Sequence, residues 1–404
     1  MLYTKEEVCE YVRSEDVKFI RLAFVDAHGN QKNVSVFAGE LERALDSGIS
    51  FDGSAIEGFS TIDKSDMFLL PDSSTLAILP WRPSHGKVVR MFCDVINPDK
   101  TPYQSCPRYI LKQAVKEAEK CGITVNIGTE FEFYLFKTDE DGENSGIPLD
   151  RAGYMDIAPL DKCENIRREI CLALESMGII PETSHHEEGP GQNEIDFRYS
   201  DALRAADNAV TFAGVVRTVA SQNGLVADFS PKPLENESGN GLHINMSLSG
   251  KDKNPIPYGS FMAGIMEHLA EIAVFMNPSD DSYKRLGHKK APYAISWSHY
   301  NRTQCIRIPA AAGEYERFEI RNADSACNPY IVYALLIYAG LDGIKRKLTP
   351  PDECGEDLYT ASSETLSALP KLPFSLEEAK AIAKDSEFIK SIIPESILKS
   401  YKII

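Results

Sequence analysis

The stretch that most constrains how this chain can fold is a short run of aromatic, aliphatic and acidic residues, Gly128–Phe136. These residue types are typical of a buried β-strand, in which successive side chains point to opposite faces. Glu130 and Glu132 therefore share one face, and Phe131 and Phe133 share the other. Carboxylates this close repel each other and lose hydration, so they either take up protons or bind cations. We expect a metal site here; the alternative is an edge strand with solvated glutamates.

A second acidic stretch, His185–Phe197, contains a Gly-Pro-Gly turn between two extended segments. Glu187 lies at the end of the first segment and Glu194 begins the second. Because the turn reverses the chain, it can bring both carboxylates to one cation. The alternative is a solvated surface loop.

A third candidate strand, Gly239–Ser247, alternates so that His243, Asn245 and Ser247 lie on one face. One imidazole among carboxylates suits Mg²⁺ or Mn²⁺ better than zinc, which prefers more nitrogen or sulfur ligands. The alternative is a core histidine bonded to the backbone.

Arginines gather in one part of this acidic chain, at positions 285, 302, 307, 317 and 321. Arg317, Glu319 and Arg321 alternate and therefore share a strand face. Guanidinium groups bind carboxylates and phosphates bidentately, and a glutamate between them fits a metal ligand beside phosphates. The alternative is a surface ladder of ion pairs.

Charge and composition exclude some classes of protein. The formal charge of −17 argues against a general binder of nucleic acid or anionic membranes. The first residues lack a charged-then-apolar leader, and the apolar run Ile331–Leu341 is too short to span a bilayer. The 9 cysteines form no CxxC pair, which favours reduced thiols and a cytoplasmic protein.

The length of 404 residues suits two or three domains, and the proline-rich segment 97–102 is typical of a boundary. We expect helices at residues 5–14, 40–47, 107–120, 165–177, 202–223, 260–275, 329–346 and within 376–404. We expect strands at residues 17–26, 32–37, 76–80, 87–94, 128–136, 225–229 and 242–248. The polar run 137–145 is typical of an exposed hairpin loop.

Glutamates and a histidine for cations, with arginines for anions, are the groups that phosphoryl transfer requires. The sequence has no Gly-x-x-x-x-Gly-Lys-[Ser/Thr] motif, which argues against a P-loop NTPase.

At this point the chain resembles a known family, the type I (bacterial) glutamine synthetases. The matching motifs follow the family's order over roughly residues 15–345. They are Phe51–Ser54, Ser65–Met67, Gly128–Phe136, His185–Phe197, Pro231–Pro233, Gly241–Leu248, Ser282–Leu286, Asn301–Arg302, Ile306–Pro309, Arg317–Arg321 and Asn328–Tyr330.

The resemblance implies an α+β fold, with an N-terminal β-grasp domain in residues 1–100 and a catalytic domain in residues 104–404. The catalytic domain would contain a curved antiparallel sheet flanked by helices. The active site would form between neighbouring subunits of a hexameric ring, and two rings can stack into a dodecamer. The implied activity is the ligation of ammonia to L-glutamate through γ-glutamyl phosphate, with ATP and two to three Mg²⁺ or Mn²⁺ ions.

The resemblance also implies roles for individual residues. One metal would be held by Glu132, Glu187 and Glu194, and the other by Glu130, His243 and Glu319. Glutamate would be held by Arg285, Arg302, Arg321 and the backbone of Gly239. The nucleotide would be contacted by Glu182, Tyr199, Asn245, Ser247, Arg307 and Arg317. Ammonium would be bound and deprotonated by Asp52 of the neighbouring subunit, with Tyr154 and Glu187 beside it.

The chain departs from the family in the loop that closes the site. Lys290 stands where the family has a glutamate, and a lysine there would repel ammonium. The segment between Ser249 and Ser260 is also short. Three interpretations therefore remain: a glutamate–ammonia ligase, which we favour, a related γ-glutamyl ligase for another amine, and a catalytically impaired paralogue.

Overall fold

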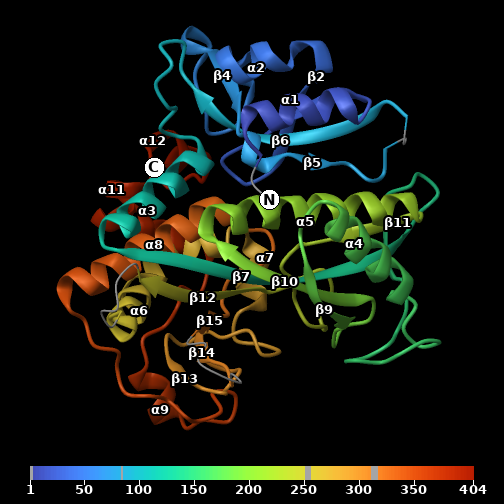
Figure 1. The fold of residues 1–404 in the computed structure, drawn as a ribbon. Coiled ribbons are helices and arrows are strands. Elements are labelled where there is room, and N and C mark those ends of the chain that lie inside the picture. Colours follow the sequence, from blue (N-terminus) through green and yellow to red (C-terminus); the bar gives the residue numbers. More distant parts are fainter. Residues whose placement is uncertain (1–2, 83–84, 251–255, 311–316) are drawn as a thin grey trace.

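The protein contains two β-sheets with helices packed against them, in a computed structural model that describes residues 3–82, 85–250, 256–310 and 317–404 (Figure 1). The short segment after Ser249 lies partly outside these ranges. The helices of these ranges are α1 Lys5–Ser14, α2 Leu41–Ser47, α3 Pro107–Lys120, α4 Glu164–Ser176, α5 Ala202–Gln222, α6 Tyr258–Met276, α7 Asp280–Arg285, α8 Pro329–Arg346, α9 Ser363–Ala368, α10 Leu376–Asp385, α11 Glu387–Ile392 and α12 Glu395–Ser400. The strands are β1 Val17–Val25, β2 Gln31–Phe37, β3 Ile49–Asp52, β4 Asp66–Pro71, β5 Ala77–Ile78, β6 Lys87–Ile96, β7 Ile123–Thr138, β8 Asn144–Pro148, β9 Pro181–His186, β10 Gln192–Asp201, β11 Leu225–Asp228, β12 Leu242–Gly250, β13 Trp297–His299, β14 Ile306–Ile308 and β15 Phe318–Ile320.

The N-terminal sheet has the strand order β2-β1-β6-β4-β3, with β5 added to β6. Strand β1 pairs antiparallel with β2 and parallel with β6, and α1 buries Val8 and Val12 in the same core. This is the β-grasp arrangement that the resemblance implies. The sequence analysis missed β4, whose Met67 and Leu69 alternate inward, because a short strand ending at a proline is recognised only by its pairing with β3 and β6.

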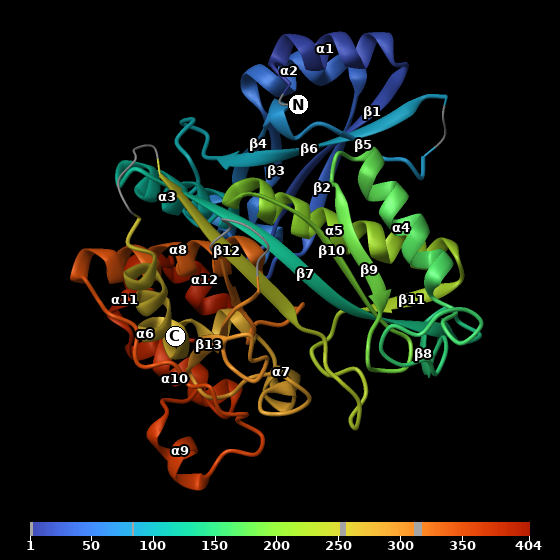
Figure 2. The ribbon, with the colours of Figure 1, turned by 60° about the horizontal axis from the view of Figure 1, so that its bottom comes forward.

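The larger sheet has the order β13-β14-β15-β12-β7-β10-β9, with β8 and β11 also paired to β7. Its pairs are antiparallel except β13 with β14. Figure 2 shows β12, β7, β10 and β9 side by side across the middle of the molecule. The central strand, β7, is longer than the predicted 128–136 and continues into the predicted hairpin with β8. The predicted curved antiparallel sheet is confirmed.

Helices α3 and α5 lie between the N-terminal unit and β7 (Figure 1). The ring of Phe131 on β7 stacks on Phe212 of α5, with 4.8 Å between their centres, and Phe133 is fully buried in the same core. Burial of each phenylalanine stabilises the fold by about 2 kcal/mol. This face of β7 is therefore fixed in the core, and alternation leaves Glu130 and Glu132 on the opposite face.

Arg108 on α3 joins the two units. It is 2% exposed and donates to Asp94 of β6 at 2.8 Å, to Asp72 after β4 at 2.8 Å and to Asp207 of α5 at 3.0 Å. Three carboxylates around one guanidinium keep the charge compensated where water is excluded. The two sheets are therefore held in one relative placement by a buried ion network.

Among the described helices, α6 is the one that is long and apolar enough to cross a membrane by length and composition. The apolar run 331–341 considered from the sequence lies within α8, and α6 was not considered there. Of the apolar window in α6, 72% is buried inside the protein, where α6 packs against α8. Gly264 of α6 and Gly343 of α8 allow this approach, because a Cβ on Gly264 would lie 2.2 Å from the Ala339 carbonyl oxygen. The helix is thus part of the core.

Candidate active site

The predicted carboxylates meet on the solvent-facing side of β7 because of the strand register. Glu130 lies opposite His243 of β12, and Glu132 lies opposite Glu194 of β10. Asp196 of β10 is the other cross-strand neighbour of Glu130. In antiparallel sheets such neighbours have Cβ atoms about 5 Å apart, so their side chains interact. The prediction that Glu130 and Glu132 share a face opposite the core is confirmed.

One group of ligand atoms is formed by Glu130, His243 and Glu319, which lie within 4.8 Å of one another. His243 Nδ1 is 3.1 Å from Glu130 Oε2 and 3.7 Å from Glu319 Oε1. Asn245 donates from Nδ2 to Glu130 Oε1 at 2.8 Å. Strand β15 thus brings a third residue to the pair that β7 and β12 already form.

Further groups centre on Glu194. Its carboxylate lies within 4.8 Å of ligand atoms of Glu132 and His243, and also of His185 and Glu187. Glu187 reaches this position because the Gly-Pro-Gly turn reverses the chain. The Glu187 N–H donates to the Gln192 carbonyl at 2.8 Å and closes the turn. The prediction that the turn brings Glu187 and Glu194 together is confirmed.

The electrostatics of these carboxylates are those of crowded like charges. Burial and the charge of Glu132 raise the pKa of Glu187 to about 7, and the same two causes hold the pKa of Glu194 well above its usual range. Burial and Glu130 raise the pKa of Asp196 to about 7. Burial alone would raise the pKa of Glu130 also, but hydrogen bonds from His243 and Asn245 and the charge of His243 lower it to about 2.

The donor set fits divalent cations of the magnesium and manganese type. Carboxylate oxygens with a single imidazole are the ligands these ions prefer, whereas a zinc site would hold more nitrogen or sulfur. A bound cation would also remove the repulsion that raises the pKa values of Glu187 and Glu194. The residues present therefore suit the metals that the sequence predicts.

Four of the predicted arginines line the same cavity as the carboxylates. Together with the carboxylates they line a cavity of about 350 Å³, to which Arg285, Arg302, Arg307 and Arg321 contribute. Glu319 is fully buried and forms ion pairs with both Arg307 and Arg321. A buried carboxylate requires such partners, and the same guanidinium groups face the cavity. An anion inside the cavity would thus meet guanidinium groups beside the carboxylates that could hold cations.

Gly239, Arg285 and Tyr154 also lie in this cavity lining. A Cβ on Gly239 would be 2.3 Å from the Pro231 carbonyl oxygen, so this close backbone packing requires glycine. Arg285 is 3% exposed and donates from Nη1 to the Asn322 carbonyl at 3.1 Å. Burial lowers its pKa, and the carboxylate of Glu132 acts in the opposite direction.

Several predicted nucleotide contacts lie outside the cavity lining, along the same face of the sheet. Tyr199 is 57% exposed and lies over Gly128, where a Cβ would be 3.3 Å from the Tyr199 Cβ and 3.9 Å from that of Asn245. Ser247 lies opposite Asn126 in the register, two residues further along β12. The side chains of Glu182 and Arg317 are exposed.

Asp52 is not brought to the cavity of its own chain. It ends β3 in the N-terminal sheet, where its carboxylate accepts from the Ser54 hydroxyl at 2.6 Å and the Ser54 N–H at 2.9 Å. These two hydrogen bonds lower the pKa of Asp52, so it is a carboxylate at neutral pH. The prediction that it serves a neighbouring subunit's site stays a prediction.

Several residues that line the cavity were not predicted from the sequence, among them His185, Glu188, Gln192 and Asp196. Alternation could have found two of them, because His185 and Asp196 lie two positions from Glu187 and Glu194. Gln192 donates to the Gly239 carbonyl at 3.1 Å, a contact that spans the sheet and has no local signal. Glu188 enters through an ion pair with Lys290, also a long-range contact.

A buried network supports the turn that carries Glu187. His186 is fully buried, with Nε2 2.9 Å from Asp150 Oδ1 and Nδ1 2.7 Å from the Glu187 carbonyl oxygen. Asp150 also accepts the N–H groups of Gly191 at 3.0 Å and Lys162 at 2.8 Å. These bonds fix the backbone on both sides of the Gly-Pro-Gly turn and so position its carboxylates.

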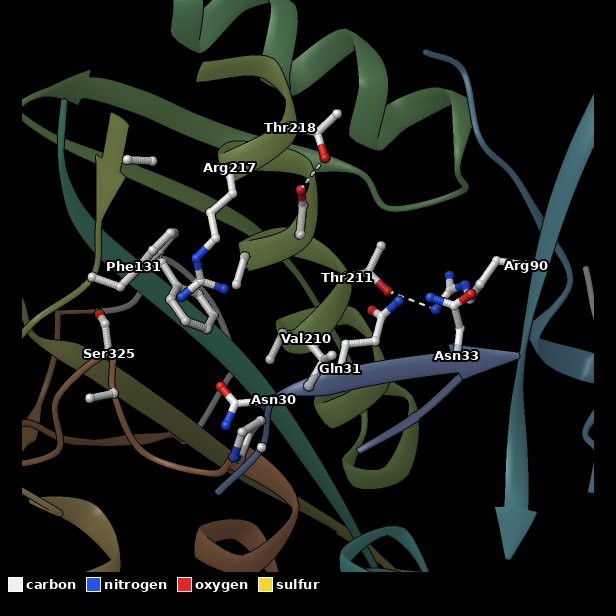
Figure 3. A pocket seen from close by; sticks show the side chains of 18 of the residues that line it. Asn30, Gln31, Asn33, Arg90, Phe131, Val210, Thr211, Arg217, Thr218 and Ser325 are labelled. Carbon is white, nitrogen blue, oxygen red and sulfur yellow. Dashed lines mark hydrogen bonds between the residues drawn. The ribbon is translucent and has the colours of Figure 1, made fainter. Parts of the chain in front are cut away.

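A larger cavity, of about 810 Å³, lies on the other side of the sheet, where the N-terminal hairpin meets α5 (Figure 3). Phe131 lines it, whereas its neighbours Glu130 and Glu132 line the smaller one. Figure 3 shows Arg90, Arg217 and Thr211 around this space, with Arg90 donating to Thr211 at 3.0 Å. The carboxylates of the candidate metal sites line the smaller cavity and not this one.

Carboxylates for divalent cations and guanidinium groups for anions line one cavity, on an α+β fold with a β-grasp unit. Together they define a metal-dependent enzyme of the phosphoryl-transfer class. Comparison with known proteins identifies the family. The glutamine synthetase catalytic domain matches residues 104–404, and the glutamine synthetase β-grasp domain matches residues 16–98. The chain belongs to the glutamine synthetase family.

Curated relatives match along nearly their whole length. A glutamine synthetase of Clostridium saccharobutylicum is 45% identical, with 99% of this chain and 93% of the relative covered. A glutamine synthetase of Methanosarcina mazei is 44% identical, with 98% of this chain and 92% of the relative covered.

Solved structures agree with the fold. A GmaS/ADP complex has a TM-score of 0.88 at 27% identity, covering 98% of this chain and 94% of the other. A glutamine synthetase of Plasmodium falciparum has a TM-score of 0.85 at 27% identity, covering 99% and 94%.

Proposed function

We propose that this protein is a glutamate–ammonia ligase that forms L-glutamine, ADP and phosphate from L-glutamate, ammonia and ATP. The observation that carries the proposal is one cavity lined by both carboxylates and arginines. Two anions, glutamate and ATP, must approach each other for this reaction, and such a site offsets their repulsion. The similarity to glutamine synthetases over 98–99% of the chain supports the same activity.

The two metal sites follow the clusters on the sheet. We assign Glu130, His243 and Glu319 to one cation, and Glu132, Glu187 and Glu194 to the other. Mg²⁺ or Mn²⁺, with two to three ions in each active site, fits these oxygen-rich ligands. When bound, the cations neutralise phosphate charge and polarise the transferred group. Asn245 supports this assignment, because its hydrogen bond to Glu130 holds that carboxylate in place.

The chain's own residues then perform distinct tasks. Arg285 and Arg321, with the backbone of Gly239, hold glutamate so that its side-chain carboxylate faces the γ-phosphate. An oxygen of that carboxylate bonds to the γ-phosphorus as the bond to the ADP oxygen breaks, which gives γ-glutamyl phosphate and ADP. Arg302 stabilises the negative charge that develops on the transferred group. Ammonia then bonds to the carbon of the γ-carboxyl group, the added nitrogen gives up a proton to one of the nearby carboxylates, and the bond to phosphate breaks, which gives glutamine and phosphate.

The nucleotide extends along the exposed face of the sheet beyond the cavity. The residues we assign to it are Glu182, Tyr199, Asn245, Ser247, Arg307 and Arg317. Gly128 leaves room beneath Tyr199, whose exposed ring offers a surface on which a base can stack. The similarity to a GmaS structure that contains ADP supports nucleotide binding by this fold.

Ammonium is bound by negative charge at the far end of the cavity. Glu187 and Tyr154 lie there, and we assign the remaining carboxylate to Asp52 of a neighbouring subunit. Because Asp52 lies outside its own chain's cavity, the complete site requires an oligomer, for which the family suggests a hexameric ring, possibly stacked as a dodecamer. All nine cysteines are free thiols, which fits a reducing compartment such as the cytoplasm.

A second candidate is a γ-glutamyl ligase for another amine, which Lys290 at the cavity favours. The test is phosphate release from ATP with glutamate and Mn²⁺, measured with ammonium and with a panel of primary amines. We expect release that requires both glutamate and ammonium, together with formation of glutamine. Equal release with and without ammonium, raised by one of the other amines, would establish the second candidate instead.

A further inference from the structure

The ammonium group of Lys290 lies at the solvent-facing edge of the cavity. Its Nζ forms an ion pair with Glu188 and lies 5.7 Å from the centre of the Tyr154 ring. The Lys290 side chain is 50% exposed and that of Glu188 is 33% exposed, and both line the cavity beside Glu187. A side-chain cation from this chain therefore stands among groups that attract cations.

The loop that carries Lys290 has a defined shape. It follows Arg285 directly, and Lys289 and Lys290 have φ of 47° and 66°, in the left-handed region that side chains with a Cβ disfavour. Hydrogen bonds hold it, from the Gly287 N–H to the Ala291 carbonyl at 2.9 Å and from the Ala291 N–H to the His288 carbonyl at 2.9 Å. Lys290 is thus presented to Glu188 by an ordered turn.

Carboxylates and the face of an aromatic ring are the groups that bind ammonium and alkylammonium ions. Glu188 and Tyr154 supply both, from the β9–β10 turn and from the segment before α4. The primary ammonium of Lys290 has the same charge and the same donors as the cation that the proposed reaction consumes. The Lys290 ammonium group and a substrate ammonium ion repel each other when both are in the cavity. The repulsion weakens as the Lys290 side chain moves away from the bound ion.

We propose that Lys290 is a tethered cation that occupies the amine end of the cavity, and that a substrate ammonium ion must displace it to bind. This inference rests on the proposed function and identifies a residue that weakens the binding of a charged amine relative to an uncharged one. Partly exposed ion pairs hold their partners weakly, so displacement should raise the KM for ammonium by about two- to fivefold.

The test is Lys290→Met, which keeps the apolar stem and removes the ammonium group. Amide formation would be measured against ammonium and against hydroxylamine, a nucleophile that is uncharged at neutral pH. We expect the KM for ammonium to fall about two- to fivefold, with the KM for hydroxylamine unchanged. Lys290→Arg retains the charge and should leave the ratio of the two KM values near that of the wild type.

Lys284→Met provides a matched control, because Lys284 is an exposed lysine of α7 that pairs with Asp281 outside the cavity. It should leave both KM values unchanged. A KM for ammonium that is unchanged or higher in Lys290→Met would overturn the inference, as would an equal change for both nucleophiles, which indicates a distorted loop. A wild-type enzyme that forms no amide with either nucleophile would overturn the proposed function, and this inference with it.

Discussion

Replacing Glu187 by glutamine should stabilise the metal-free protein above neutral pH and reduce its stabilisation by manganese. In the fold, burial and the nearby charge of Glu132 raise the pKa of Glu187 from the ordinary value of 4.5 to about 7. Below pH 4.5 the folded and unfolded chains both carry the proton. Between pH 4.5 and 7 only the folded chain keeps it, so stability falls as pH rises, and above pH 7 the full penalty is present.

The size of the effect follows from this pKa difference. At about 1.4 kcal/mol per pKa unit, the charged carboxylate costs the fold about 3 kcal/mol above pH 7. Glutamine carries no charge but still offers an oxygen to the Glu188 N–H, which Glu187 now accepts at 2.9 Å. Because a neutral acceptor binds this N–H more weakly, we expect a net gain of about 2 kcal/mol in the free energy of unfolding.

The free energy of unfolding of the wild type and of Glu187→Gln would be measured by urea denaturation at a fixed protein concentration. The measurements are made at pH 5 and pH 8, with EDTA or with Mn²⁺. We expect the gain at pH 8 in EDTA and a much smaller gain at pH 5. In Mn²⁺ the wild type should be the more stable of the two proteins. An ion at one hundred times its Kd stabilises the wild type by about 2.7 kcal/mol, and the variant lacks one of the carboxylates that would bind it. Glu140→Gln, at an exposed position of the β7–β8 loop, is the control. An equal difference at both pH values, or a less stable variant at pH 8 in EDTA, would refute the reasoning.

Three further changes test other parts of the structure. Glu132→Ala should weaken Mn²⁺ binding in calorimetric titration and abolish glutamine formation, and unchanged activity would contradict its assignment as a ligand. Arg108→Met should lower the free energy of unfolding by about 3–5 kcal/mol, because it leaves Asp207 buried without its cation; a near-neutral result in urea denaturation would show that the network is dispensable. Gly264→Ala should cost about 1–3 kcal/mol, since its Cβ would lie 2.2 Å from the Ala339 carbonyl oxygen, and a melting temperature equal to the wild type's would disprove this close packing.

Much of the candidate site could be predicted because it rests on local rules. The alternation of Glu130, Phe131 and Glu132 depends only on the two-residue period of an extended chain, so it follows once the strand is recognised. The turn between Glu187 and Glu194 is similarly local, since Gly and Pro favour a turn through their own backbone preferences. The long helices α5, α6 and α8 follow from apolar periodicity in the same way.

Other features required the tertiary structure, because they depend on which distant segments pair. Strand β4 is apolar at nearly every position and ends at Pro71, so its sequence shows no two-residue period. Asp196 meets Glu130 only through the register of β10 on β7. The pair of Lys290 with Glu188 joins positions 102 residues apart. The sequence by itself determined which residue types are available and which face each side chain takes, because these depend on backbone period. Only the folded chain decided which carboxylates repel each other, which arginines pair with Glu319 and where Lys290 lies, because long-range packing sets those distances.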